Sequence, residues 1–207
     1  MSEVSLGLIL VAALIASASP GPATLALSGT AMAQGRIPAL WLALGITTGS
    51  FIWSIAAAFG LSAIMFANAW VFQIMRYLGA AYLLFLAIKS ARSAMRAGDA
   101  KPVSLGTHTG RRMYLKGLAL HVTNPKAILF FGALYAVGVP AGSSPSVLGL
   151  VILAVGLQSA IVFHGFALVF SSTPMAHLYL KARRGLDALF ALGFSAAAAK
   201  ILTTRLE

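Results

Sequence analysis

Lys126 is the residue of this chain whose position most clearly calls for a chemical role. It follows Asn124 and Pro125 in the stretch HVTNPKAILFF and precedes a run of apolar residues. An ionised ammonium among apolar residues is costly unless a partner compensates its charge. Two uses fit such a group: it holds a substrate carboxylate, or it titrates as part of proton coupling. A structural use, in which the lysine caps free helix carbonyls, is left open.

A second stretch that can do chemistry is SASPGPATLALSG, which contains Pro20, Gly21 and Pro22. Each proline lacks an amide hydrogen and its ring crowds the preceding turn, so a helix passing through this stretch loses backbone hydrogen bonds. Pro125 has the same effect beside Lys126. At such breaks, free amide hydrogens can bind anions and free carbonyls can bind cations. We therefore assign substrate binding and translocation to Pro20, Gly21, Pro22, Thr24, Asn124, Pro125 and Lys126.

Four further polar residues in or beside apolar stretches are candidates for proton coupling or gating, namely His164, Gln158, Asp187 and Arg76. Histidine titrates near neutral pH and can relay protons, but an interhelical hydrogen bond explains His164 equally well. Asp187 can pair with an arginine one turn earlier, and Arg76 can anchor its helix at the membrane surface. For all four residues a structural role stays open.

Several kinds of chemistry are excluded by residues that the sequence lacks. There is no cysteine, which rules out thiol nucleophiles, thiolate metal sites and disulfides. The apolar stretches contain no paired carboxylates and no histidine pair at metal-ligand spacing. We expect neither an enzyme nor a metal site nor a cofactor.

The elements that must position these residues are membrane helices. Of 207 residues, 59% are hydrophobic and 9% charged, which is too little polar surface to coat a soluble globule. A bilayer core about 30 Å thick needs roughly 20 apolar residues per helix. We predict an all-α integral membrane protein with six transmembrane helices, the first retained because it lacks the basic start of a signal peptide. Their approximate spans are residues 4–33, 38–67, 70–88, 117–139, 147–170 and 186–204.

The two proline breaks fall at corresponding places, each in the first helix of a three-helix half. Three crossings are an odd number, so the halves have opposite orientations in the membrane and form an inverted repeat. We predict one transmembrane domain over residues 1–207, with halves of about 1–95 and 112–207 joined by a basic cytoplasmic loop. Paired breaks in helices 1 and 4 are typical of the binding site of a secondary transporter.

The formal charge of +11 is explained by membrane orientation. Arg36 follows the first apolar stretch, and basic residues cluster between the third and fourth stretches and between the fifth and sixth. The last cluster is Lys181, Arg183 and Arg184. Positively charged short loops stay in the cytoplasm, so both termini are predicted outside. The partner that this charge implies is the lipid bilayer, not nucleic acid.

The whole chain resembles the lysine exporter and homoserine/threonine efflux family (LysE/RhtB type) of bacterial inner-membrane exporters. The resemblance depends on SPGP, GRIPALWLALGITTGS, RYLGAAYLLFLAIKSAR, LKGLALHVTNPKAILFF and RRGLDALFALG. It implies export of an amino acid or a close derivative from the cytoplasm, driven by the proton gradient in an antiport cycle. The family motifs fall on Pro20, Gly21, Pro22, Asn124, Pro125 and Lys126.

One departure from the family pattern concerns the substrate. Many relatives follow the first motif with Asn or Asp, whereas this chain has Ala23 and then Thr24. An Asn or Asp side chain, which could bind an ammonium or a substrate side chain, is therefore absent at this place. Export of another small solute and a non-transporting membrane scaffold remain the alternatives, and a homo-oligomer is left open.

Overall fold

The computed structural model describes residues 6–19, 21–67, 69–95, 110–140 and 142–203. Every regular element within these ranges is a helix, and the described part of the chain has eight of them. Their bounds are α1 Leu6–Ala18, α2 Pro22–Gln34, α3 Arg36–Ala67, α4 Ala69–Met95, α5 Gly110–Val122, α6 Pro125–Gly138, α7 Pro145–Phe170 and α8 Thr173–Thr203. The prediction of an all-α protein is confirmed for these residues.

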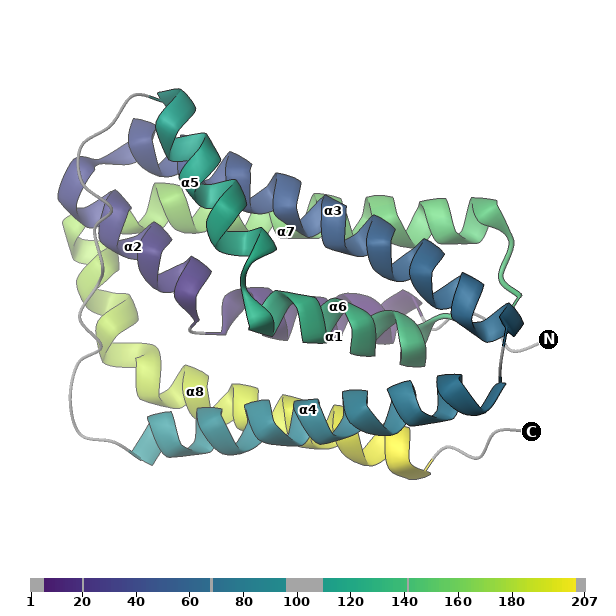
Figure 1. The fold of residues 1–207 in the computed structure, drawn as a ribbon. Coiled ribbons are helices and arrows are strands. Elements are labelled where there is room, and N and C mark those ends of the chain that lie inside the picture. The colour runs from purple at the N-terminus through teal and green to yellow at the C-terminus, as the bar shows by residue number, and fades with distance from the viewer. Residues whose placement is uncertain (1–5, 20, 68, 96–109, 141, 204–207) are drawn as a thin grey trace.

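The helices run between two ends of an elongated molecule (Figure 1). The end of α2, the start of α3, the end of α4, the start of α5 and the junction of α7 with α8 lie at one end. The start of α1, the junction of α3 with α4, the end of α6, the start of α7 and the end of α8 lie at the other. Helices α1 and α6 pack together in the middle, with α4 and α8 along one side and α3, α5 and α7 on the other.

Both proline motifs separate two short helices. α1 and α2 are bent by 54° relative to one another, and Pro22 is the first residue of α2. α5 ends at Val122 and α6 begins at Pro125, so Thr123 and Asn124 form the second interruption. Proline is suited to a first helical position because the amide hydrogen there has no partner within the helix. Pro20 lies outside the described residues.

Two helical segments of the described chain have the length and composition of membrane spans. Arg36–Gly60 and Pro145–Phe170 are each long and apolar enough to cross a bilayer, and α1 with α2 qualifies as a third if the bent pair is one span. The exposed face of α7 carries leucines and isoleucines at helical spacing, at Leu150, Leu153, Leu157 and Ile161. Such a stripe suits contact with lipid. The predicted number of six spans stays a prediction.

The helix bounds correct one detail of the sequence analysis. Lys181 and Arg184 were expected in a connection, but both lie within α8, which begins at Thr173. The physical reason is that a helix can continue beyond the apolar stretch, where water solvates its charged side chains. Lys181 and Arg184 are both exposed.

Glycines allow α3 and α5 to approach at backbone distance. A Cβ atom at Gly45 would lie 2.0 Å from the Tyr114 carbonyl oxygen, and one at Gly117 would lie 2.2 Å from that of Leu42. A Cβ at Gly49 would lie 2.9 Å from Cβ of His121. Small residues are typical of close helix contacts in membranes. This contact holds the end of α5, and with it His121, against α3.

Candidate functional site

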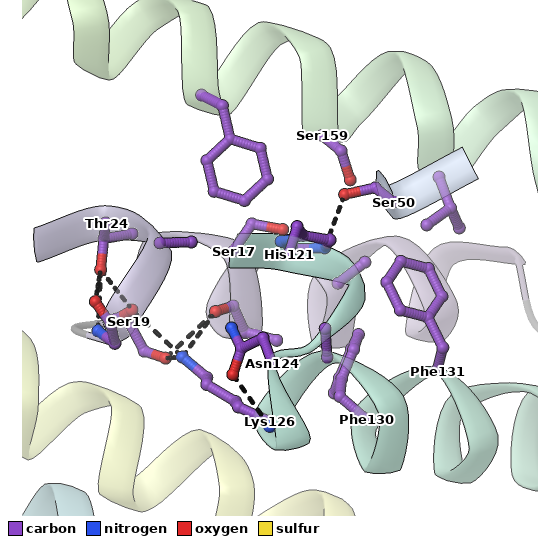
Figure 2. Close-up of a pocket in the computed structure, with 17 residues that line it drawn as sticks. Ser17, Ser19, Thr24, Ser50, His121, Asn124, Lys126, Phe130, Phe131 and Ser159 are labelled. Atoms are coloured by element: carbon purple, nitrogen blue, oxygen red, sulfur yellow. Dashed lines mark hydrogen bonds between the residues drawn. The ribbon is translucent and has the colours of Figure 1, made fainter. Parts of the chain in front are cut away.

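A cavity lies where the two helix interruptions meet, enclosed by α1, α2, α3, α5, α6 and α7 (Figure 2). Its empty space, including the part that opens outward, is about 470 Å³. The polar residues that line it are Ser17, Ser19, Thr24, Ser50, His121, Asn124, Lys126 and Ser159, and its larger apolar residues are Phe130, Phe131, Val155 and Phe163.

Lys126 connects the two interruptions. Its ammonium donates to the carbonyl oxygens of Ala16 at 3.0 Å and Ser19 at 3.1 Å, and to the Ser19 hydroxyl. These three acceptors match the three donors of an ammonium group. They lie at the C-terminal end of α1, where the helix dipole also favours a positive charge. The charge that the sequence analysis singled out is therefore satisfied by carbonyls of the first break.

Asn124 precedes α6 and holds the backbone amide of Lys126. Its side-chain oxygen accepts a hydrogen bond from the Lys126 amide at 3.0 Å, so Asn124 is the N-cap of the helix. The Asn124 side chain is buried, at 5% exposure. Asparagine is among the best N-cap residues because its oxygen satisfies an amide at the helix start. The order Asn-Pro-Lys therefore follows from the start of the helix: Asn124 is the cap, Pro125 is the first helical residue, and Lys126 carries the charge.

Thr24 holds the other interruption. Its hydroxyl accepts from the Gly21 amide at 2.7 Å and is within hydrogen-bond distance of the Gly21 and Ser19 carbonyls, at 3.0 and 3.3 Å. A Cβ atom on Gly21 would come within 3.4 Å of the Lys126 side chain, at both Cδ and Nζ. Gly21 therefore leaves the space through which Lys126 reaches α1.

His121 is a cavity residue that the sequence analysis missed. Its Nε2 lies 3.1 Å from the Ser50 hydroxyl of α3, its Nδ1 has no hydrogen-bond partner among the described residues, and the side chain is 5% exposed. The ring packs edge-on against Phe163, with centroids 5.9 Å apart. The signal was available, since His121 falls inside the predicted span 117–139 and the rule applied to Lys126 covers every ionisable residue within a span.

Of the four candidates for proton coupling or gating, three lie outside the cavity and the fourth has a side chain that is not described. None of His164, Gln158 and Asp187 lines the cavity. His164 bonds the Ala160 carbonyl through Nδ1 at 2.9 Å, and Gln158 donates to the Leu10 carbonyl at 2.8 Å. Asp187, 1% exposed, accepts from Ser93 at 2.7 Å and so connects α8 to α4. The side chain of Arg76 lies outside the described residues.

The residues that bring the elements together are thus Ser19, Lys126, His121 and Ser50, contributed by the end of α1 and by α6, α5 and α3. Among the described residues there is no group of three or more histidine, cysteine, aspartate or glutamate side chains placed to hold a metal ion. The geometry offers a single fixed ammonium, hydroxyls and aromatic rings around a small cavity.

Comparison with known proteins identifies the family of this chain. The family model described as LysE type translocator matches residues 14–205. A threonine efflux protein of Salmonella typhimurium is 30% identical over 184 residues, covering 86% of this chain and 89% of the relative. A leucine efflux protein of Enterobacter sp. is 29% identical over 195 residues, covering 88% and 89%.

A threonine efflux protein of Escherichia coli K12 is 33% identical over 125 residues, covering 59% of this chain and 61% of the relative. No solved structure matches the chain. The family match covers nearly the whole chain, including both interruptions and the cavity between them. The chain belongs to the LysE type translocator family and is therefore a multi-pass bacterial membrane transporter rather than an enzyme.

Proposed function

We propose that this protein exports neutral amino acids from the cytoplasm, with Lys126 binding the substrate carboxylate. The observation that carries the proposal is the position of the Lys126 ammonium, which joins two helix interruptions inside one cavity. Relatives named threonine efflux protein and leucine efflux protein support amino-acid efflux. A cavity that carries a fixed positive charge suits a solute with a carboxylate.

The lining of the cavity favours a neutral side chain on the substrate. None of the described lining residues is an aspartate or a glutamate, so a lysine or arginine side chain would find no counter-charge there. Hydroxyl groups from Ser17, Thr24 and Ser159 suit a small polar side chain, and the rings of Phe130 and Phe163 suit an apolar one. Threonine and leucine are the first substrates to test.

The contacts of Lys126 suggest how an amino acid is bound. The carbonyls of Ala16 and Ser19 now accept from a primary ammonium, and the α-ammonium of an amino acid is chemically equivalent to it. In the proposed exchange, the substrate ammonium takes these carbonyls, and the released Lys126 ammonium pairs with the substrate carboxylate. Opposite charges then remain paired throughout, which avoids leaving a single charge in an apolar cavity.

Alternating access around the two interruptions is the proposed transport mechanism. If the chain is an inverted repeat of six spans, then α1, α2, α3 and α4 correspond to α5, α6, α7 and α8. Matching contacts of α3 and α7 support this: α3 packs on α5 and α6, and α7 packs on α1 and α2. Rocking of one half against the other would open the cavity to each side in turn.

Uptake into inside-out membrane vesicles tests the proposal. The cytoplasmic face of the membrane is then outermost, so export appears as accumulation of a labelled amino acid, and an acidic lumen supplies the proton gradient. We expect threonine or leucine, but not lysine, to accumulate when the gradient is present. Lys126→Ala should abolish accumulation, and Lys126→Arg should lower it, since arginine keeps the charge but has a different shape.

Lys181→Ala is the matched control, because Lys181 is exposed on α8 and does not line the cavity. Size-exclusion profiles in detergent must show that each variant is folded. Normal uptake by a folded Lys126→Ala protein would refute the assigned role of the lysine. If the folded native protein accumulates no amino acid, then export of another solute or the scaffold alternative is favoured instead.

A further inference from the structure

His121 is a second ionisable group within the cavity, and the exchange proposed for Lys126 does not use it. The side chain is 5% exposed and lines the cavity, and within the described part of the chain its Nδ1 has no hydrogen-bond partner. An unpartnered polar atom in a buried position costs free energy and therefore calls for an explanation. Figure 2 shows His121 beside Ser50, with Asn124 and Lys126 in the same cavity.

The hydrogen bonds of Ser50 indicate which nitrogen of His121 is free to accept a proton. The Ser50 hydroxyl has one hydrogen, and we assign this hydrogen to the Ile46 carbonyl, which lies 3.3 Å away. The contact of 3.1 Å between Ser50 and His121 is then donated by the Nε2 hydrogen of the imidazole. In that tautomer Nδ1 carries a bare lone pair. With this assignment, the unpartnered nitrogen is a base.

We propose that His121 is the residue that accepts the co-transported proton, and that Ser50 is a positioning residue that holds its tautomer. This inference rests on the proposed proton-coupled export. A proton from the outer solution binds the Nδ1 lone pair and forms an imidazolium, which keeps its Nε2 hydrogen bond to Ser50. After the cavity opens to the cytoplasm, the same proton passes from Nδ1 to water.

The charges around His121 explain why protonation would drive export. Among the described lining residues, Lys126 of α6 is the other ionisable group; α1, α2, α3 and α7 contribute hydroxyls and apolar side chains. Lys126, an imidazolium and a substrate ammonium would place three positive charges against one carboxylate. Like charges within one cavity repel each other most strongly where water is scarce. A proton that enters from outside therefore favours release of the amino acid to the outside, which is the order required for antiport.

Replacement of each histidine in turn tests the inference. In His121→Gln the side chain still reaches Ser50 but cannot titrate. We expect uptake into inside-out vesicles to lose its several-fold stimulation by an acidic lumen, while exchange of labelled for unlabelled amino acid continues. His164→Gln is the comparison, because His164 bonds the Ala160 carbonyl outside the cavity, and its stimulation should remain.

Ser50→Ala provides a second readout. Loss of the Nε2 partner should shift the pH at which uptake is half-maximal, whereas Ser159→Ala alters the cavity wall without removing a bond to His121. Gradient stimulation that persists in His121→Gln refutes the inference, and so does loss in His164→Gln alone. If His121→Gln does not fold, an unchanged pH profile in Ser50→Ala refutes it. Absence of gradient stimulation in the native protein refutes proton coupling itself, which distinguishes the two failures.

Discussion

The ammonium of Lys126, in the first turn of α6, lies 3.1 Å from the carbonyl oxygen of Ser19, directly after α1. The two residues are 107 positions apart in the sequence. Each belongs to an interruption created by proline, and each interruption leaves polar groups that need partners. Their contact gives the Lys126 ammonium an acceptor and the Ser19 carbonyl a donor, and both residues line the cavity.

The Ser19 hydroxyl should contribute to substrate affinity. It accepts from Lys126, and it would also accept from a substrate ammonium that takes the place of the Lys126 ammonium at the carbonyls. A hydrogen bond to a charged group contributes about 1.5–3 kcal/mol, which corresponds to tenfold or more in an equilibrium constant. We expect Ser19→Ala to raise the KM for uptake about tenfold, measured from initial rates. Ser28→Ala, on α2 and outside the cavity, should leave the KM unchanged; equal KM values in both variants would contradict the assignment.

The Asn124 cap should stabilise the start of α6. Asn124→Ala removes the acceptor for the Lys126 amide, and loss of such a cap costs about 1 kcal/mol. We expect a lower unfolding temperature in detergent, with most of the loss restored in Asn124→Asp, since aspartate is also a good cap. The control is Thr123→Ala on the neighbouring exposed residue. A decrease of the same size in the control would mean that the cap has no special role.

Gly45 should be intolerant of even a methyl group. Its Cβ would overlap the Tyr114 carbonyl, a backbone atom that cannot move without displacing α5. We expect Gly45→Ala to lower the yield of monodisperse protein several-fold, because the packing of α3 on α5 is lost. At Gly149 on α7 a Cβ would meet no atom within 4 Å, so Gly149→Ala should behave like the native protein. Size-exclusion chromatography compares the two, and equal yields would argue against a close helix contact.

Asp187 should act through the packing of α8 on α4. It is 1% exposed and accepts from Ser93 of α4 at 2.7 Å. We expect Asp187→Ala to lower the unfolding temperature, because it leaves buried polar groups without an acceptor. Asp187→Asn should lower it less, since the amide oxygen can still accept from Ser93. If instead the Asn variant is stable but loses gradient-driven uptake, the charge of Asp187 belongs to proton coupling.

The proposed membrane orientation can be tested with single cysteines, because the chain contains none of its own. Ser144, between α6 and α7, is expected outside, and Lys181, near the start of α8, is expected in the cytoplasm; both are exposed. An impermeant maleimide should label Ser144→Cys in intact cells and Lys181→Cys only after the membrane is opened. Added cysteines beside Glu3 and Glu207, which lie outside the described residues, should also react from outside. The reverse pattern would invert the proposed topology.

Local chemistry was readable from the sequence. Proline cannot donate a backbone hydrogen bond, so Pro22 and Pro125 determine where helices begin, and Asn124 supplies the cap within two residues of the amide that it accepts from. A lysine among apolar residues likewise indicates that its charge needs a hydrogen-bonding or charged partner. These properties depend on neighbours in the chain, which is why the helical fold could be predicted from the sequence, and why Pro22, Pro125 and Lys126 could be singled out as candidates.

Only the tertiary structure decided which partners meet. The bond between His121 and Ser50 joins residues 71 positions apart, and it depends on the close approach of α3 and α5 that the glycines permit. The contact of Lys126 with Ala16 and Ser19 likewise depends on how α6 packs beside α1. Periodicity and motifs describe one helix at a time, whereas a cavity is produced by the distances and rotations between helices. Those quantities follow from packing across the whole molecule, and no single segment contains them.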